Sequence, residues 1–141
     1  MDTDDGKKLT RENENMMSFE EFCNIAEEEA ALLPEYAYDE LEGGVLADPG
    51  TYLHPKRVED DLYILGTYSR ELTGRKIVLY YGSFMAVMGN ASEEEVRKQI
   101  RDTLRHEFRH HLESRAGLYF GGTLIEEDRD SMIRYYMRHK N

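Results

Sequence analysis

The sequence predicts a single α+β domain, and two observations lead to that prediction. Three segments open with a helix-capping pattern, a serine or threonine followed three residues later by a glutamate, near residues 18, 92 and 123. Between the first two, residues 61–71 and 75–88 are rich in aromatic and β-branched side chains and are separated by a short link. Helices flanking a strand-rich middle indicate α+β architecture with an antiparallel hairpin.

The first helix is expected to begin at Ser18, because Ser18 and Glu21 form a capping box. Apolar residues follow it at helical spacing, and Pro34 is expected to end the helix. Residues 1–16 are charged and almost free of apolar side chains, so we expect a disordered acidic tail. The domain itself is then expected to span 17–141.

The middle of the chain is expected to supply a small mixed or antiparallel sheet. Tyr36 to Leu46 is predicted as a strand interrupted by two glycines, followed by the hairpin of 61–71 and 75–88. Gly66 and Gly82 fall inside the hairpin strands, where glycine usually marks a bulge or a close backbone approach. The second helix is expected to run from Ser92 to about Ala116, and a last helix to follow Thr123.

Composition excludes several classes of function. The formal net charge is −11, which argues against a nucleic-acid partner, because affinity for phosphates comes mainly from Lys and Arg. No apolar run is long enough to span a membrane, and the polar segment at residues 1–15 leads us to expect no signal peptide. The single cysteine, Cys23, fits a reducing compartment, so a cytoplasmic location is expected.

The second helix contains the segment LRHEFRHHLE, in which His106, Glu107 and His110 form an H-E-x-x-H motif. Successive residues of a helix turn by about 100°, so His106 and His110 lie about 40° apart on one face, one turn from each other. Val96, Ile100, Leu104, Phe108 and Leu112 define the core-facing side of the same helix. The two imidazoles are therefore expected at the edge of the buried face, where the wall of a cleft would lie.

This spacing is typical of zinc hydrolysis, because two imidazoles on one face can bind the same Zn²⁺ ion. Glu107 is expected to act as the general base that accepts a proton from the attacking water, without ligating the metal. The alternative without a metal is a charged surface helix whose His and Glu side chains face water. His111 falls within the apolar arc and is expected to be a buried, hydrogen-bonded residue. Asp102 is expected either to support His106 or to make a surface contact.

The third ligand is left open by the motif. Glu113 lies on the histidine face but about 7–8 Å along the axis from the midpoint of the pair, which is far for a glutamate. The acidic cluster Glu126, Glu127 and Asp128 opens the next helix and offers alternatives, although such residues also compensate the helix dipole.

Several segments, in order, resemble the small bacterial zincin-like metallopeptidase family: MSFEEF, LGTYSR, GRKIVLYYGSFM and IRDTLRHEFRHH. The resemblance covers about residues 16–138 and implies a minimal zincin-like domain. That domain has a backing helix, a small sheet, an active-site helix and a C-terminal helix. It carries over His106 and His110 as metal ligands and Glu107 as general base. The family's third ligand is an Asp six residues after the second motif histidine, but this chain has Ala116 there. Matching the start of the last helix puts Glu127 in that position, with Asp128 and Glu126 as the next choices.

The sequence therefore predicts a peptidase that uses one zinc ion to hydrolyse peptide or other amide bonds in a peptide or protein substrate. The hairpin strand Lys76–Met85 is expected to hold an extended substrate by strand addition. The alternatives are a non-catalytic, metal-stabilised protein-interaction module and a metal-free interaction domain. A tyrosine hydroxyl is one candidate for oxyanion stabilisation, and Tyr80, Tyr81, Tyr119, Tyr135 and Tyr136 are equivalent choices in the sequence. The sequence does not indicate an oligomeric state.

Overall fold

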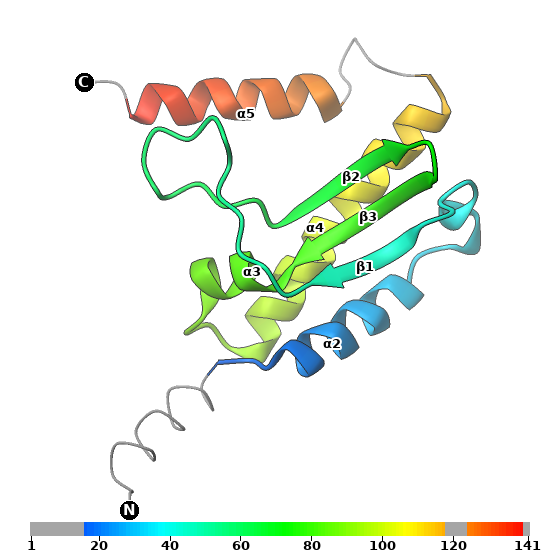
Figure 1. Ribbon diagram of the computed structural model, residues 1–141, viewed down its shortest axis with the longest axis horizontal. Helices are drawn as coiled ribbons and strands as arrows, with labels where there is room; N and C mark the ends of the chain where they lie inside the picture. Colours follow the sequence, from blue (N-terminus) through cyan, green and yellow to red (C-terminus); the bar gives the residue numbers. More distant parts are fainter. Residues whose placement is uncertain (1–15, 118–123, 140–141) are drawn as a thin grey trace, which may run out of the picture.

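The computed structural model describes residues 16–117 and 124–139, which form a three-stranded sheet covered by helices (Figure 1). The helices are α2 (Phe19–Ala31), α3 (Tyr81–Met88), α4 (Glu93–Arg115) and α5 (Leu124–Arg138), with a short 3-10 helix η1 (Glu35–Tyr38). The strands are β1 (Gly44–Asp48), β2 (Gly66–Glu71) and β3 (Gly74–Tyr80). The predicted α+β class is confirmed, while the predicted tail 1–16 lies outside the described residues except for its last position.

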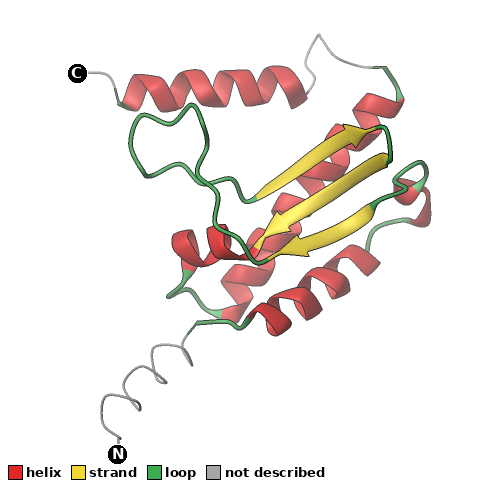
Figure 2. Cartoon of the chain, in the orientation of Figure 1, coloured by secondary structure: helices red, strands yellow, loops and turns green. Residues whose placement is uncertain are grey.

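The sheet is mixed, and β3 is its central strand. Its order is β1-β3-β2, with β2 antiparallel to β3 and β1 parallel to β3. The predicted hairpin is thus confirmed for 66–80. Helices α2 and α4 pack on each other and on the strands, so that they back the sheet (Figure 2). The core between these layers contains buried side chains from α2, the central strand β3 and α4, including Phe22, Ile77, Leu79, Ile100 and Leu104.

Both serines predicted to cap helices within the described residues do so. The Ser18 side chain accepts a hydrogen bond from the Glu21 amide, and the Ser92 side chain accepts one from the Glu95 amide. Helix α4 ends at Arg115, followed by Gly117 with φ 72°, the left-handed conformation that glycine adopts readily. The box predicted at Thr123 lies outside the described residues.

Two predicted strand regions adopt other structures. The chain leaves β3 at Tyr80 and continues as α3, although 75–88 is predicted as one strand. Tertiary contacts override the strand propensity there, because the Ser83 hydroxyl bonds to the backbone of Tyr52 and the buried Phe84 ring packs on Phe22 at 5.0 Å between centroids. Likewise, most of 36–46 is not a strand: η1 buries Ala37, and β1 starts only at Gly44.

The close backbone approaches predicted at Gly66 and Gly82 are both found. A Cβ added to Gly66 would lie 2.9 Å from Thr103 Cγ2, so β2 sits directly against α4. A Cβ added to Gly82 would lie 2.0 Å from Thr51 Oγ1 and 2.7 Å from the Gly50 carbonyl. Gly82 therefore allows the chain that follows β1 to cross closely over the start of α3.

An acidic residue of α2, Glu29, is buried against α4. Glu29 is 5% exposed and accepts hydrogen bonds from Arg101 Nε at 2.7 Å and Arg97 Nη1 at 2.9 Å. The Arg101 hydrogen bond is the main cause that lowers the pKa of Glu29, with Arg97 acting in the same direction. This buried ion pair fixes how α2 meets the helix that carries the H-E-x-x-H motif.

Candidate metal centre

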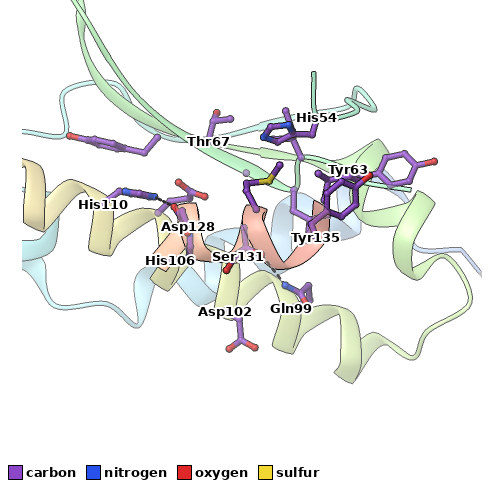
Figure 3. A pocket seen from close by; sticks show the side chains of 18 of the residues that line it. His54, Tyr63, Thr67, Gln99, Asp102, His106, His110, Asp128, Ser131 and Tyr135 are labelled. Carbon is purple, nitrogen blue, oxygen red and sulfur yellow. Dashed lines mark hydrogen bonds and ion pairs between the residues drawn. The ribbon is translucent and has the colours of Figure 1, made fainter. Parts of the chain in front are cut away.

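Helix α4 presents the two motif histidines to a cleft, as the helical geometry predicts. Four of its five predicted core residues are buried, whereas Leu112 is 37% exposed and His111 takes the buried position beside it. The rings of His106 and His110 lie 5.1 Å apart between centroids, and their side chains are 40% and 21% exposed. Figure 3 shows both imidazoles together at the edge of the helix.

Helix α5 brings Asp128 onto this histidine pair. The Nε2 atom of His110 lies 2.8 Å from Asp128 Oδ2, and the Nε2 atom of His106 lies 3.3 Å from Asp128 Oδ1 (Figure 3). One ligand atom from each of the three residues lies within 4.8 Å of the other two. Two imidazole nitrogens and a carboxylate oxygen that converge in this way form the donor set that Zn²⁺ uses in hydrolytic sites. The residues present therefore fit a divalent metal ion.

The other carboxylates predicted as possible third ligands are not found at the histidine pair among the described residues. Glu127, assigned from the family resemblance, and Glu126 lie in the first turn of α5, but their side chains lie outside the described part of the structure, so those assignments stay predictions. Glu113 accepts a hydrogen bond from Arg109 Nε at 2.7 Å and is not part of the ligand group found among the described residues. Asp128, an alternative from sequence, is the carboxylate that the structure brings to the histidines.

Glu107 lies beside the metal group but outside it. Its side chain is buried, with 7% of the residue exposed, and it lines the same cleft as the histidines. Burial raises the pKa of Glu107 to about 7, and the negative charge of Asp128 adds to the effect. A carboxyl group with a pKa near neutrality can both accept and return a proton at ordinary pH, which is the property a general base needs.

The residues that flank the motif support the helix rather than the ligand group. His111 is fully buried, and its Nε2 lies 2.7 Å from the carbonyl oxygen of Asp39, which can only accept. Its Nδ1 therefore accepts from the Tyr68 hydroxyl at 2.9 Å. The predicted buried role of His111 is thus confirmed. Asp102 pairs with Lys98 at 3.3 Å and points away from the imidazoles in Figure 3, so its surface-contact alternative holds.

A cleft of about 790 Å³ opens in front of the metal group. Its floor is α4, one wall is β2 with the residues before it, and the other wall is α5, from which Met132 and Tyr135 line it. His54 and Tyr63 close one side. Apart from Tyr135, which the sequence offers as an oxyanion candidate, these wall residues could not be predicted, because they lie far from the motif and carry no local signal of their own.

The predicted tyrosine candidates for oxyanion stabilisation have other partners. The hydroxyl of Tyr80 pairs with Thr67 at 3.0 Å, and that of Tyr81 donates to the Met17 carbonyl. Tyr135 and Tyr136 hydroxyls bond to the loop before β2. Tyr119 lies outside the described residues.

Together, the helix-borne motif, the facing carboxylate and the buried glutamate define a zincin-type site. Residues 54–130 match the model of the zincin-like metallopeptidase family, and the chain belongs to that family. Its fold is similar to the solved structure of a conserved hypothetical protein from Thermo thermophilus, with 32% sequence identity and a TM-score of 0.63. That match covers 71% of this chain and 98% of the other. A search of curated proteins finds no match. No helix among the described residues combines the length and apolar character needed to cross a bilayer.

Proposed function

We propose that this protein is a zinc-dependent peptidase. The observation that supports the proposal most strongly is the convergence of His106, His110 and Asp128 within 4.8 Å at a cleft, with the buried Glu107 beside them. His106, His110 and Asp128 would hold the metal. When bound, zinc supplies Lewis-acid polarisation of a carbonyl and lowers the pKa of water.

Glu107 performs the proton transfers of the proposed reaction. Its carboxylate accepts a proton from the water that attacks the scissile carbonyl carbon and then delivers that proton to the leaving amine nitrogen. The cleft around it has mostly apolar walls, including Leu65 and Met132, which limit the water that competes for its carboxylate. His111, held neutral by burial that lowers its pKa, fixes the helix behind Glu107 through Tyr68 and Asp39.

Strand β2 is the element best placed to hold an extended substrate. The sequence predicts that role for Lys76–Met85, but β3 is the central strand and is paired on both sides, so its backbone is not free to add a strand. β2 is at the sheet edge, and Gly66, Thr67 and Tyr68 line the cleft opposite the metal group. A peptide laid along this edge would gain backbone hydrogen bonds and cross in front of His106 and His110.

The test compares zinc-loaded wild-type protein with Glu107→Gln on a mixture of unblocked peptides, analysed by mass spectrometry. Glu107→Gln should retain one zinc ion but lose cleavage by about a hundredfold or more, since general base catalysis contributes on that order. Glu113→Gln is the matched control on the same helix, because Glu113 bonds to Arg109 rather than to the metal group, and it should cleave normally.

Two outcomes would overturn the proposal. Equal cleavage by wild type and Glu107→Gln would mean that Glu107 is not the base. Zinc binding without cleavage of any peptide would favour the metal-stabilised interaction module instead.

A further inference from the structure

The C-terminal half of α5 is fastened to the loop before β2 through one tyrosine. Tyr135 is 4% exposed, and its hydroxyl accepts a hydrogen bond from the Val58 amide at 2.8 Å. The same hydroxyl donates to Asp61 Oδ1 at 2.8 Å. A buried hydroxyl that both accepts and donates in this way fixes the helix relative to the loop in position and in rotation.

His139 completes this contact from the end of the helix. Its Nδ1 lies 2.9 Å from the Tyr135 carbonyl oxygen, and its Nε2 lies 2.6 Å from Asp61 Oδ2. Both neighbours are acceptors, so both ring nitrogens must carry protons and the ring is an imidazolium. The Tyr135 carbonyl and then Asp61 raise the pKa of His139, and the His139 hydrogen bond lowers the pKa of Asp61.

The charged surroundings of His139 do not require a second metal ion. Glu59 lies with Asp61 and His139 in a group whose ligand atoms are within 4.8 Å of one another. However, both Asp61 oxygens already accept protein hydrogen bonds, from Tyr135 and from His139. Arg138 lies over the Tyr135 ring at 5.9 Å and adds a positive charge on the same helix end. An ion pair accounts for this geometry. We call Tyr135, Asp61 and His139 the α5 anchor.

The anchor and the metal group are joined by a rigid connection. Asp128 lies seven residues before Tyr135 on the same helix, which is two turns and leaves the two side chains about 20° apart around the axis. Met132 lies between them, and all three line the cleft. Because a helix of two turns transmits position with little bending, the anchor determines where the Asp128 carboxylate meets the histidines.

We propose that the α5 anchor is a positioning device for Asp128 and so sets the affinity of the site for zinc. This inference rests on the proposed function, because it takes Asp128 as a ligand. Without the anchor, α5 occupies its docked position for a smaller fraction of the time, and the apparent dissociation constant rises by the inverse of that fraction. Tyr135 and His139 are positioning residues, since neither touches the metal group.

The anchor gives zinc binding an unusual dependence on pH. The His139–Asp61 ion pair is complete above the lowered pKa of Asp61 and is lost as pH rises through the raised pKa of His139. Wild type should therefore bind zinc more tightly than His139→Gln at mildly acidic pH. Above the pKa of His139, the zinc affinities of the two proteins should become equal.

The test measures the dissociation constant of Zn²⁺ by competition with a chromophoric chelator, with circular dichroism to verify folding. Tyr135→Phe should weaken zinc binding roughly tenfold, the size of effect seen when groups that orient a ligand are removed. Asp61→Asn should act in the same direction. Tyr36→Phe removes a hydroxyl from a 63%-exposed tyrosine on η1 and should leave the affinity unchanged.

A double-mutant cycle separates this inference from the proposed function. In an Asp128→Ala background, Tyr135→Phe should have no further effect on zinc affinity, because the anchor acts only through Asp128. Unchanged affinity in folded Tyr135→Phe, or an equal loss in both backgrounds, would overturn the inference. Failure of the wild-type protein to bind zinc would instead overturn the proposed function.

Discussion

Replacement of Glu107 by glutamine is expected to stabilise the metal-free protein, by an amount that grows as the pH rises from about 4.5 to about 7. The pKa of Glu107 is raised from its ordinary value of 4.5 to about 7, mainly by burial. A raised carboxyl pKa means that the folded state binds more protons than the unfolded state between these two values. The free energy of unfolding therefore falls as pH rises through this window.

The magnitude follows from the difference between the two pKa values. Each pKa unit corresponds to 1.36 kcal/mol, so the penalty above the window is about 3 kcal/mol at most. Glutamine has nearly the same shape and carries no charge at any pH. The free energies of unfolding of both proteins are measured by urea denaturation with a chelator present. The difference between Glu107→Gln and wild type should be larger at pH 8 than at pH 4.5, by up to about 3 kcal/mol.

A pH-independent difference between Glu107→Gln and wild type would refute this reasoning, because it would show that Glu107 ionises as freely in the folded state as in the unfolded chain. Asp128→Asn provides an independent check. It removes the second cause of the raised pKa, so the unfolding free energy of the metal-free protein should depend less steeply on pH in that variant.

Three further outcomes are expected. Glu29→Gln should lower the free energy of unfolding by about 2 kcal/mol in urea titration, because it breaks the buried ion pair of Glu29 with Arg97 and Arg101. A variant as stable as wild type would show that this ion pair does not stabilise the fold. Gly82→Ala should reduce the melting temperature, since its Cβ would lie 2.7 Å from backbone atoms of Gly50; an unchanged melting temperature would show that the loop moves freely. Saturating zinc should raise the melting temperature of wild type but not of His106→Ala, and equal shifts in calorimetry would place the ion elsewhere.

Features encoded by neighbouring residues could be predicted from the sequence. The Ser18 and Ser92 caps act within one turn, and the placement of His106 and His110 on one face follows from helix geometry alone. The burial of His111 follows from the same periodicity. These signals need no knowledge of the rest of the fold, which explains why they succeed.

Features that depend on distant contacts could not be predicted in the same way. Helix α3 forms in a segment with high strand propensity because Ser83 and Phe84 contact residues far away in the chain. The parallel pairing of β1 with β3 places it beside a strand some 30 residues later, and no local pattern encodes that register. The burial of Glu29 could not be predicted either, because it depends on Arg97 and Arg101 of a different helix, which donate hydrogen bonds to its carboxylate.

The third metal ligand belongs to this second group. Asp128 reaches the histidines only because α5 packs across α4, and neighbouring acidic residues in the same helical turn are equivalent in sequence. Helical geometry separates such residues by about 100° each, so only the packing of α5 decides which one faces the cleft.

The most direct measurement is a crystal structure of the zinc-loaded protein with data collected on both sides of the zinc absorption edge. We expect one anomalous peak, bounded by Nε2 of His106, Nε2 of His110 and the carboxylate of Asp128, with the Glu107 carboxylate off the metal. A peak held by other residues, or one that Glu107 ligates directly, would contradict this expectation.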